Sequence, residues 1–129
     1  MGDLPMPTDA ELAILAVLWR DGPCTVRQVH EALSAAHDTA YTTTLKLMQV
    51  MTQKGLLVRD ASQRSHVFRA AKPAARTQGH LVKKLVEAAF EGSAARLAMR
   101  ALSTKRASLE ELEELETMIE RLKAEQRDD

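Results

Sequence analysis

The chain has 129 residues, 45% of them hydrophobic, and a formal net charge of zero at pH 7. This composition excludes an intrinsically disordered protein, and the apolar runs are too short to cross a bilayer. The start, "MGDLPMPTDAE", is too acidic and polar for a secretory signal, so we expect a cytoplasmic protein with no stable membrane association. The single cysteine, Cys24, permits no internal disulfide or cysteine-based metal cluster, and we expect a buried thiol.

The first two helices are predicted from paired capping signals. "TDAELAILAVLWRDG" opens with a capping box from Thr8 to Glu11 and ends at Gly22, and "TVRQVHEALSAA" repeats the device from Thr25 to Gln28. In each helix the apolar residues recur at helical spacing, which predicts one buried face per helix. These apolar residues are Leu12, Leu15, Leu18 and Trp19 in the first helix, and Val26, Val29 and Leu33 in the second.

A third helix is predicted over residues 41–54, with Gly55 as a left-handed cap. The next stretch, "LLVRDASQRSHVFRAA", has β-rich ends around a polar turn and therefore predicts a hairpin, which Pro73 closes. Three short helices followed by a two-stranded hairpin predict a winged helix-turn-helix domain over residues 1–73. The expected fold class is mainly α with a small β-hairpin wing.

Residues 74–129 are predicted to form three amphipathic helices. Gly92 and Ser93 separate the first two, and a capping box from Ser108 to Glu111 starts the last. Their apolar stripes are too narrow to close a core alone, which favours a helical dimerisation domain; packing back onto the N-terminal domain is the alternative. The residues expected at the dimer interface are Leu81, Leu85, Leu97, Leu112, Leu115, Ile119 and Leu122.

The third helix carries a polar stripe in a basic part of the chain. Residues 40–73 contain six basic residues and one acidic residue, whereas residues 1–39 and 107–129 are acidic. At about 100° per residue, Thr42, Lys46, Gln49 and Gln53 share one side of the helix. Thr44, Leu47, Met48 and Met51 fall on the opposite side, and Thr43 lies between the two.

A stripe of Thr, Lys and Gln without an acidic residue suits the DNA major groove. Lysine reaches guanine acceptors, glutamine pairs with adenine, and the threonine methyl contacts the thymine methyl. We expect base contacts from Thr42, Thr43, Lys46 and Gln49. Phosphate contacts are expected from Tyr41, Lys54, Arg59 and Arg64. An ordinary solvated helix face is the alternative, and the basic hairpin favours DNA.

Four N-terminal stretches and two C-terminal ones together resemble the penicillinase-repressor (BlaI/MecI-type) family. They are "TDAELAILAVLW", "TVRQVHEAL", "AYTTTLKLMQVMTQKGLL", "RDASQRSHVFRA", "FEGSAARLAMRAL" and "SLEELEELETMIERL". The resemblance implies a homodimeric repressor of β-lactam resistance or stress genes, which binds a palindromic operator. By position, the family's base contacts match Thr42, Thr43 and Lys46.

The same resemblance raises the question of how DNA is released. Some family members are inactivated when a membrane sensor-protease triggers cleavage in the dimerisation helices, and the bond maps near Arg100 and Ala101. The Asn-Phe pair of the best-known members is absent here, so proteolytic release stays open. Val50 stands where many relatives have arginine, and no cysteine follows Cys24, which excludes the cysteine cluster of the copper-responsive branch.

Catalytic and cofactor motifs are absent from the sequence. The four histidines, His30, His37, His66 and His80, lack metal-ligand spacing, so neither an enzyme nor a metal site is expected. Two other functions remain as rivals: a winged helix used for protein association, and a DNA-binding regulator that activates or responds to a small ligand.

Overall fold

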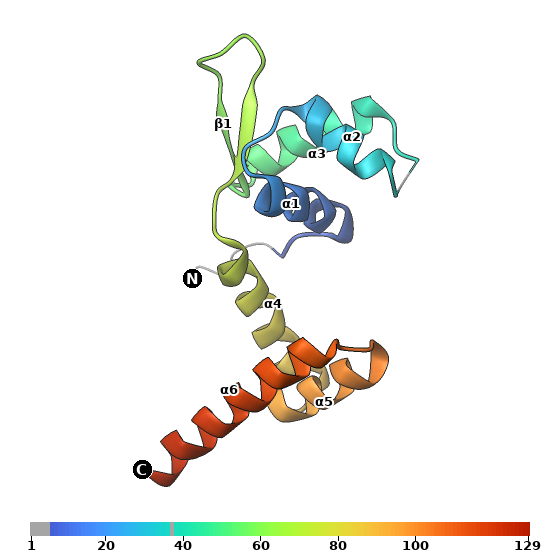
Figure 1. Cartoon of the computed structure of the whole chain (residues 1–129). Helices are drawn as coiled ribbons and strands as arrows, with labels where there is room; N and C mark the ends of the chain where they lie inside the picture. Colours follow the sequence, from blue (N-terminus) through green and yellow to red (C-terminus); the bar gives the residue numbers. More distant parts are fainter. Residues whose placement is uncertain (1–5, 37) are drawn as a thin grey trace. The chain divides into compact units, whose positions relative to one another are not determined.

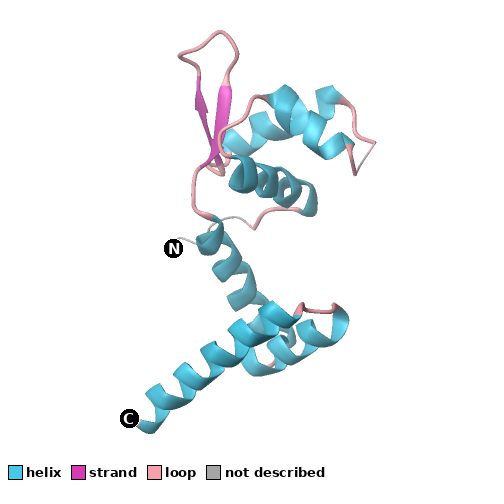
Figure 2. Cartoon of the chain, viewed as in Figure 1, coloured by secondary structure: helices cyan, strands magenta, loops and turns pink. Residues whose placement is uncertain are grey.

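The computed structural model describes residues 6–36 and 38–129, and it contains a helical N-terminal part with a hairpin followed by further helices (Figures 1 and 2). His37 and most of the acidic start, residues 1–5, lie outside the described residues. The predicted fold class, mainly α with a small β-hairpin wing, is confirmed. The elements are α1 Asp9–Asp21, α2 Val26–Ser34, α3 Tyr41–Gln53, β1 Leu57–Asp60, β2 Val67–Ala70, α4 Ala74–Ala89, α5 Ala94–Thr104 and α6 Leu109–Arg127.

The capping boxes form as the sequence predicts. The Glu11 backbone N–H donates to Thr8 Oγ1 at 3.2 Å, and the Thr8 N–H donates to Glu11 Oε1 at 2.9 Å. The same reciprocal pair joins Thr25 and Gln28, at 3.2 and 2.8 Å. Each box satisfies donors that the first turn of a helix leaves open, a contribution of about 1 kcal/mol per cap.

Gly55 ends α3 in the left-handed region, with φ +84°. The Leu56 N–H donates to the Met51 carbonyl at 2.9 Å, and the Gly55 N–H to the Thr52 carbonyl at 3.1 Å. This is a Schellman motif, in which a glycine after the helix avoids the strain that a side chain meets at positive φ. The motif turns the chain from α3 directly into β1.

The hairpin is anchored to the helices through β2. Strands β1 and β2 pair antiparallel, from Leu57 opposite Ala70 to Asp60 opposite Val67. On its other side, Phe68 exchanges two backbone hydrogen bonds with Cys24, at 3.0 and 2.8 Å, in the segment between α1 and α2. The base of the wing is therefore fixed, while its turn extends away from the core.

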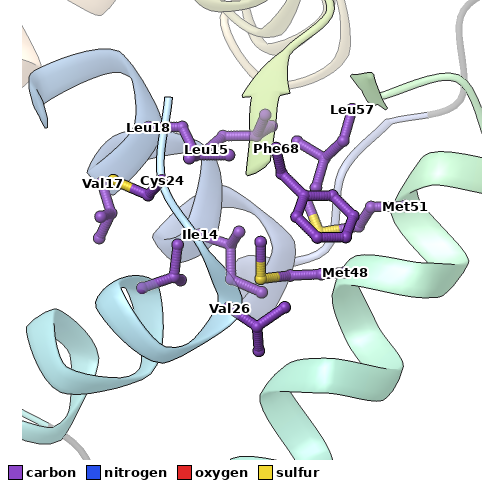
Figure 3. Close-up of a cluster of buried hydrophobic side chains, with 11 residues drawn as sticks. Ile14, Leu15, Val17, Leu18, Cys24, Val26, Met48, Met51, Leu57 and Phe68 are labelled. Atoms are coloured by element: carbon purple, nitrogen blue, oxygen red, sulfur yellow. The ribbon is translucent and has the colours of Figure 1, made fainter. Parts of the chain in front are cut away.

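One hydrophobic core holds α1, α2, α3 and the hairpin together (Figure 3). Cys24 lies in it as predicted, and burial and the neighbouring Asp21 carboxylate raise the pKa of its thiol, which makes the thiolate scarce at neutral pH. Trp19 is half-buried at the edge and donates from Nε1 to the Lys72 carbonyl at 3.0 Å. The core residues are Ile14, Leu15, Val17, Leu18, Cys24, Val26, Val29, Met48, Met51, Leu57 and Phe68.

The chain forms two compact units, Met1–Val82 and Lys83–Asp129. The division falls inside α4, whereas the domain boundary expected from the sequence was at its start, between residues 73 and 74. Thr77, His80 and Leu81 from the first turns of α4 line a small apolar crevice in the N-terminal unit together with Leu15 and Leu56. These turns therefore belong structurally with the winged helix.

The C-terminal unit has well-formed helices and almost no core. Gly92, with φ +80°, follows α4, Ser93 caps α5, and Ser108 and Glu111 form the predicted capping box at 3.0 and 2.9 Å. Within residues 83–129, all of which the structure describes, Val86 is the one buried hydrophobic residue. The caps and the helical spacing of the residues account for these helices, but packing within the chain leaves their apolar faces largely exposed.

Candidate nucleic-acid interface

Helix α3 separates its polar and apolar residues as the wheel predicts. Thr42, Lys46 and Gln49 are exposed, and Gln53 continues their stripe. Thr44, Met48 and Met51 are buried on the opposite side, with exposed fractions of 1% or less, and Leu47 is half-buried. Packing of the apolar side against α1 and α2 thus leaves a polar stripe free to meet a ligand.

The threonine triplet divides between surface and core. Thr42 and Thr43 are exposed, whereas Thr44 is buried with its Oγ1 3.5 Å from Nδ1 of His30 on α2. Thr43 borders a separate hollow near Ala13 of α1. Thr42 therefore belongs to the polar stripe, and Thr43 lies at its edge.

The start of α3 differs from those of α1 and α2 because its N-cap residue, Ala40, makes no side-chain hydrogen bond. The backbone N–H groups of the first turn are consequently not occupied by a capping side chain. Such groups, at the positive end of the helix dipole, bind phosphate well. The uncapped end lies next to Thr42, at the start of the polar stripe.

An aromatic and basic cluster joins α2 to the start of α3. The Arg27 guanidinium carbon lies 5.4 Å from the centroid of the Tyr41 ring, and the His30 ring meets Tyr41 edge-on, with centroids 5.6 Å apart. The stacking restricts Arg27, which is an exposed residue. Sequence reasoning missed Arg27, because nothing local indicates which residue of α2 meets α3.

The structure brings half of the expected contact residues into one open groove between α2, α3 and the wing. Tyr41, Gln49, Arg59 and Arg64 all line it. Figure 1 shows the hairpin beside these two helices. Thr42 and Lys46 lie on α3 outside the groove lining, exposed. The groove residues that the sequence reasoning did not propose as contacts include Thr25, Arg27, Ser65 and His66.

The wing turn is held by Asp60, the acidic residue of the hairpin. The Ser62 backbone N–H donates to Asp60 Oδ1 at 2.9 Å, and hydrogen bonds from Ser62 hold the pKa of the Asp60 carboxyl below its usual value. Because its carboxylate is engaged in the turn, Asp60 orders the loop that carries Arg64. The wing thus presents Arg59 on strand β1 and Arg64 on the turn that Asp60 orders.

Lys54 is placed differently from the other expected phosphate contacts. Its Nζ donates to Oε2 of Glu11 at 2.8 Å, and the Glu11 side chain is 2% exposed. The ammonium group therefore already has a carboxylate partner within the protein, and a phosphate contact from Lys54 stays a prediction from the sequence. Sequence reasoning could not find this pair, because the two residues are 43 positions apart.

A sequence profile described as "Penicillinase repressor" matches residues 7–121. The chain belongs to the penicillinase repressor family. Two relatives from Mycobacterium tuberculosis, strains CDC 1551 / Oshkosh and ATCC 25618 / H37Rv, are both named "Transcriptional regulator BlaI" and are 44% identical over 69 residues. The alignment covers 53% of this chain and 50% of each relative, so the chain spans about half the length of the curated relatives it matches. The resemblance predicted from the sequence is confirmed.

The residues that the apolar stripes of residues 74–129 predict for dimerisation are mostly exposed. Leu85, Leu112, Ile119 and Leu122 are 41–52% exposed. Three others, Leu81, Leu97 and Leu115, are half-buried, and Leu81 lines the apolar crevice of the N-terminal unit. Other large apolar residues of α4, α5 and α6 are exposed as well: Val82, Met99, Leu102, Leu109 and Met118.

Three further observations concern the residues of the possible cleavage site, metal binding and membrane spans. Arg100 and Ala101 are exposed residues in the interior of α5. Across residues 6–36 and 38–129, His, Cys, Asp and Glu side chains form no group of three that could hold a metal ion. In the same ranges, no helix has the length and apolar character needed to span a membrane.

Proposed function

We propose that this member of the penicillinase repressor family is a homodimeric transcriptional repressor that binds a palindromic operator, with α3 in the major groove. The observation that carries the proposal is the exposed, acid-free stripe of Thr42, Lys46 and Gln49 beside a groove lined by Arg59 and Arg64. Lysine, glutamine and threonine match base edges, and arginines flanking a helix match the backbone. The family membership supports repression.

Phosphate contacts in this proposal come from both sides of the groove. Arg59 and Arg64 lie on the wing, and Arg27 is stacked on Tyr41 on the helical side. A phosphate backbone running through the groove would meet positive charge on each side. Each neutralised phosphate releases a counterion, so these residues would supply affinity without sequence choice.

Dimerisation is supported by the lack of a hydrophobic core in the described C-terminal unit. A segment of this size with one buried hydrophobic residue buries too little apolar surface to stabilise its helices, and a second copy would cover the exposed stripes. Two-fold symmetry would then place two α3 helices on half-sites about one or more DNA turns apart. The acidic face of α6, rich in glutamate, is compatible with pairing to basic residues of the other copy.

Footprinting on the DNA upstream of the protein's own gene tests the proposal. We expect two protected patches related by two-fold symmetry, and protection that survives an excess of nonspecific duplex. If the patches vanish with nonspecific competitor while a protein partner stays bound, the module serves protein association instead. Deleting the gene should raise expression of the target, whereas a fall would indicate an activator.

Release of the DNA by proteolysis near Arg100 and Ala101 forms part of the proposal. A protease binds its substrate extended, so α5 would have to unfold locally, and none of its residues is buried. A membrane sensor-protease is the partner that the family resemblance suggests. Mass spectrometry of the protein from cells exposed to a β-lactam should detect fragments that end in α5; intact protein together with derepression would indicate a ligand-induced release.

A further inference from the structure

Glu11 is a buried carboxylate that links the first turn of α1 to the end of α3. Its side chain is 2% exposed, and both oxygens are engaged: Oε1 accepts from the Thr8 N–H at 2.9 Å and Oε2 from Lys54 Nζ at 2.8 Å. In the other ion pairs of the described residues, both side chains are at least 43% exposed. The Glu11 and Lys54 pair is therefore the one with a role inside the fold.

Glu11 is a carboxylate at neutral pH. Burial by itself raises the pKa of Glu11, but hydrogen bonds from Lys54 and Thr8 together with the Lys54 charge outweigh burial, so the pKa lies below its usual value. A capping box needs only a side-chain oxygen three residues after the N-cap residue, to accept from the N-cap backbone N–H. In α2 the neutral amide of Gln28 supplies this oxygen. The capping box therefore does not need the negative charge of Glu11, and this charge stabilises the ion pair with Lys54.

The hydrogen bond between Lys54 and Glu11 links the C-terminal end of α3 to α1. Lys54 is the C-cap residue of α3 and directly precedes the left-handed Gly55. At the other end of α3, Thr44 contacts His30 at 3.5 Å. A helix of 13 residues is about 20 Å long, so a tilt of about 10° at one end moves the other by about 3 Å, more than a hydrogen bond tolerates.

We propose that Glu11 and Lys54 are positioning residues for operator recognition, which fix the tilt of α3 and hence the bases that its stripe meets. This inference rests on the proposed DNA-binding function. It assigns to Lys54 a role distinct from a phosphate contact. The pair acts through Thr42, Lys46 and Gln49, and it does not itself touch DNA.

The test compares Glu11→Gln, Lys54→Met and the double variant in the full-length protein, at a temperature where circular dichroism shows each to be folded. Affinity for the operator and for a nonspecific duplex is measured at several salt concentrations. Operator affinity should fall by about tenfold in each single variant, with no further loss in the double variant, as coupled partners behave. Nonspecific affinity and the salt dependence should stay unchanged.

Lys123→Met is the matched control. It removes the same positive charge, but from an exposed ion pair with Glu120 on α6, with Nζ and Oε1 3.5 Å apart. If Lys54→Met lowers the salt slope by about one and Glu11→Gln does not weaken binding, Lys54 contacts phosphate and the inference is wrong. A lower melting temperature with an unchanged ratio of specific to nonspecific affinity would reduce the pair to a stabilising role. Absence of operator preference in the wild-type protein would instead reject the proposed function.

Discussion

The two compact units of this chain reach their helices by different means. The N-terminal unit packs α1, α2, α3 and the hairpin around eleven buried residues, whereas Val86 is the one buried hydrophobic residue of the described C-terminal unit. Both units contain helices with side-chain N-caps, α1 and α2 in the first unit and α5 and α6 in the second. Caps and helical periodicity therefore specify secondary structure, whereas a core requires apolar faces that pack together, within one chain or between two.

The largest expected effect is on the core of the N-terminal unit. Ile14→Ala removes a fully buried side chain and should lower the free energy of unfolding by about 2–5 kcal/mol, from lost burial and the cavity left behind. Urea unfolding measures it. Val58→Ala is the control, because Val58 is 39% exposed, and the change there should be well under half as large. Equal losses would contradict a core confined to the helices and the base of the wing.

A charge on the apolar stripe of α6 should break the dimer. Ile119 is 52% exposed in the single chain, and Ile119→Asp would bury an unpaired carboxylate in the proposed interface. A penalty of about 3 kcal/mol corresponds to a dimer dissociation constant raised roughly 100-fold. Sedimentation velocity over a concentration series measures it. Thr117→Asp, on the other side of α6, should leave assembly intact; a monomeric wild-type protein would refute the interface.

Loss of Lys46 should affect sequence choice. Lys46→Ala removes a base contact of the proposed major-groove stripe, and should relax discrimination at one position of each half-site by about 1–3 kcal/mol. Binding to operators with single substitutions at every position measures this. Uniform weakening on all sequences would instead assign Lys46 to a phosphate.

Loss of a wing arginine should act on all sequences alike. Arg64→Ala removes a positive charge from the groove, and the slope of affinity against salt should fall by about one. Titrations on operator and nonspecific duplex at several salt concentrations check it, with Arg121→Ala on α6 as the matched control. An unchanged slope would remove the wing from the interface.

The smallest effect concerns acid stability of the N-terminal unit. The pKa of Glu11 is lowered in the folded state, because hydrogen bonds and charge outweigh burial, so its stabilisation is present above the ordinary value of 4.5 and is lost as pH falls through the folded value. Urea unfolding from about pH 6 to about pH 3 should show a shallower loss of stability for Glu11→Gln than for the wild type. Parallel curves would contradict an ionised buried pair.

Local sequence signals were enough to predict the helices and strands and the buried face of each helix of the N-terminal unit. Capping boxes at Thr8, Thr25 and Ser108 were predicted because their partners lie three residues away, and Gly55 because a helix ending needs a residue that accepts positive φ. The division of the threonine triplet followed from the helical period alone.

The contacts between distant elements became known from the folded chain. It paired Lys54 with Glu11 and stacked Arg27 on Tyr41. It also placed the division between the units inside α4, because the first turns of that helix face Leu15 and Leu56. Contacts between residues far apart in the sequence depend on how whole helices and strands pack together. The spacing of residues along the chain does not indicate which distant residue a side chain will contact. The residues proposed to contact DNA were therefore visible in the sequence, whereas the contact between Glu11 and Lys54 was not.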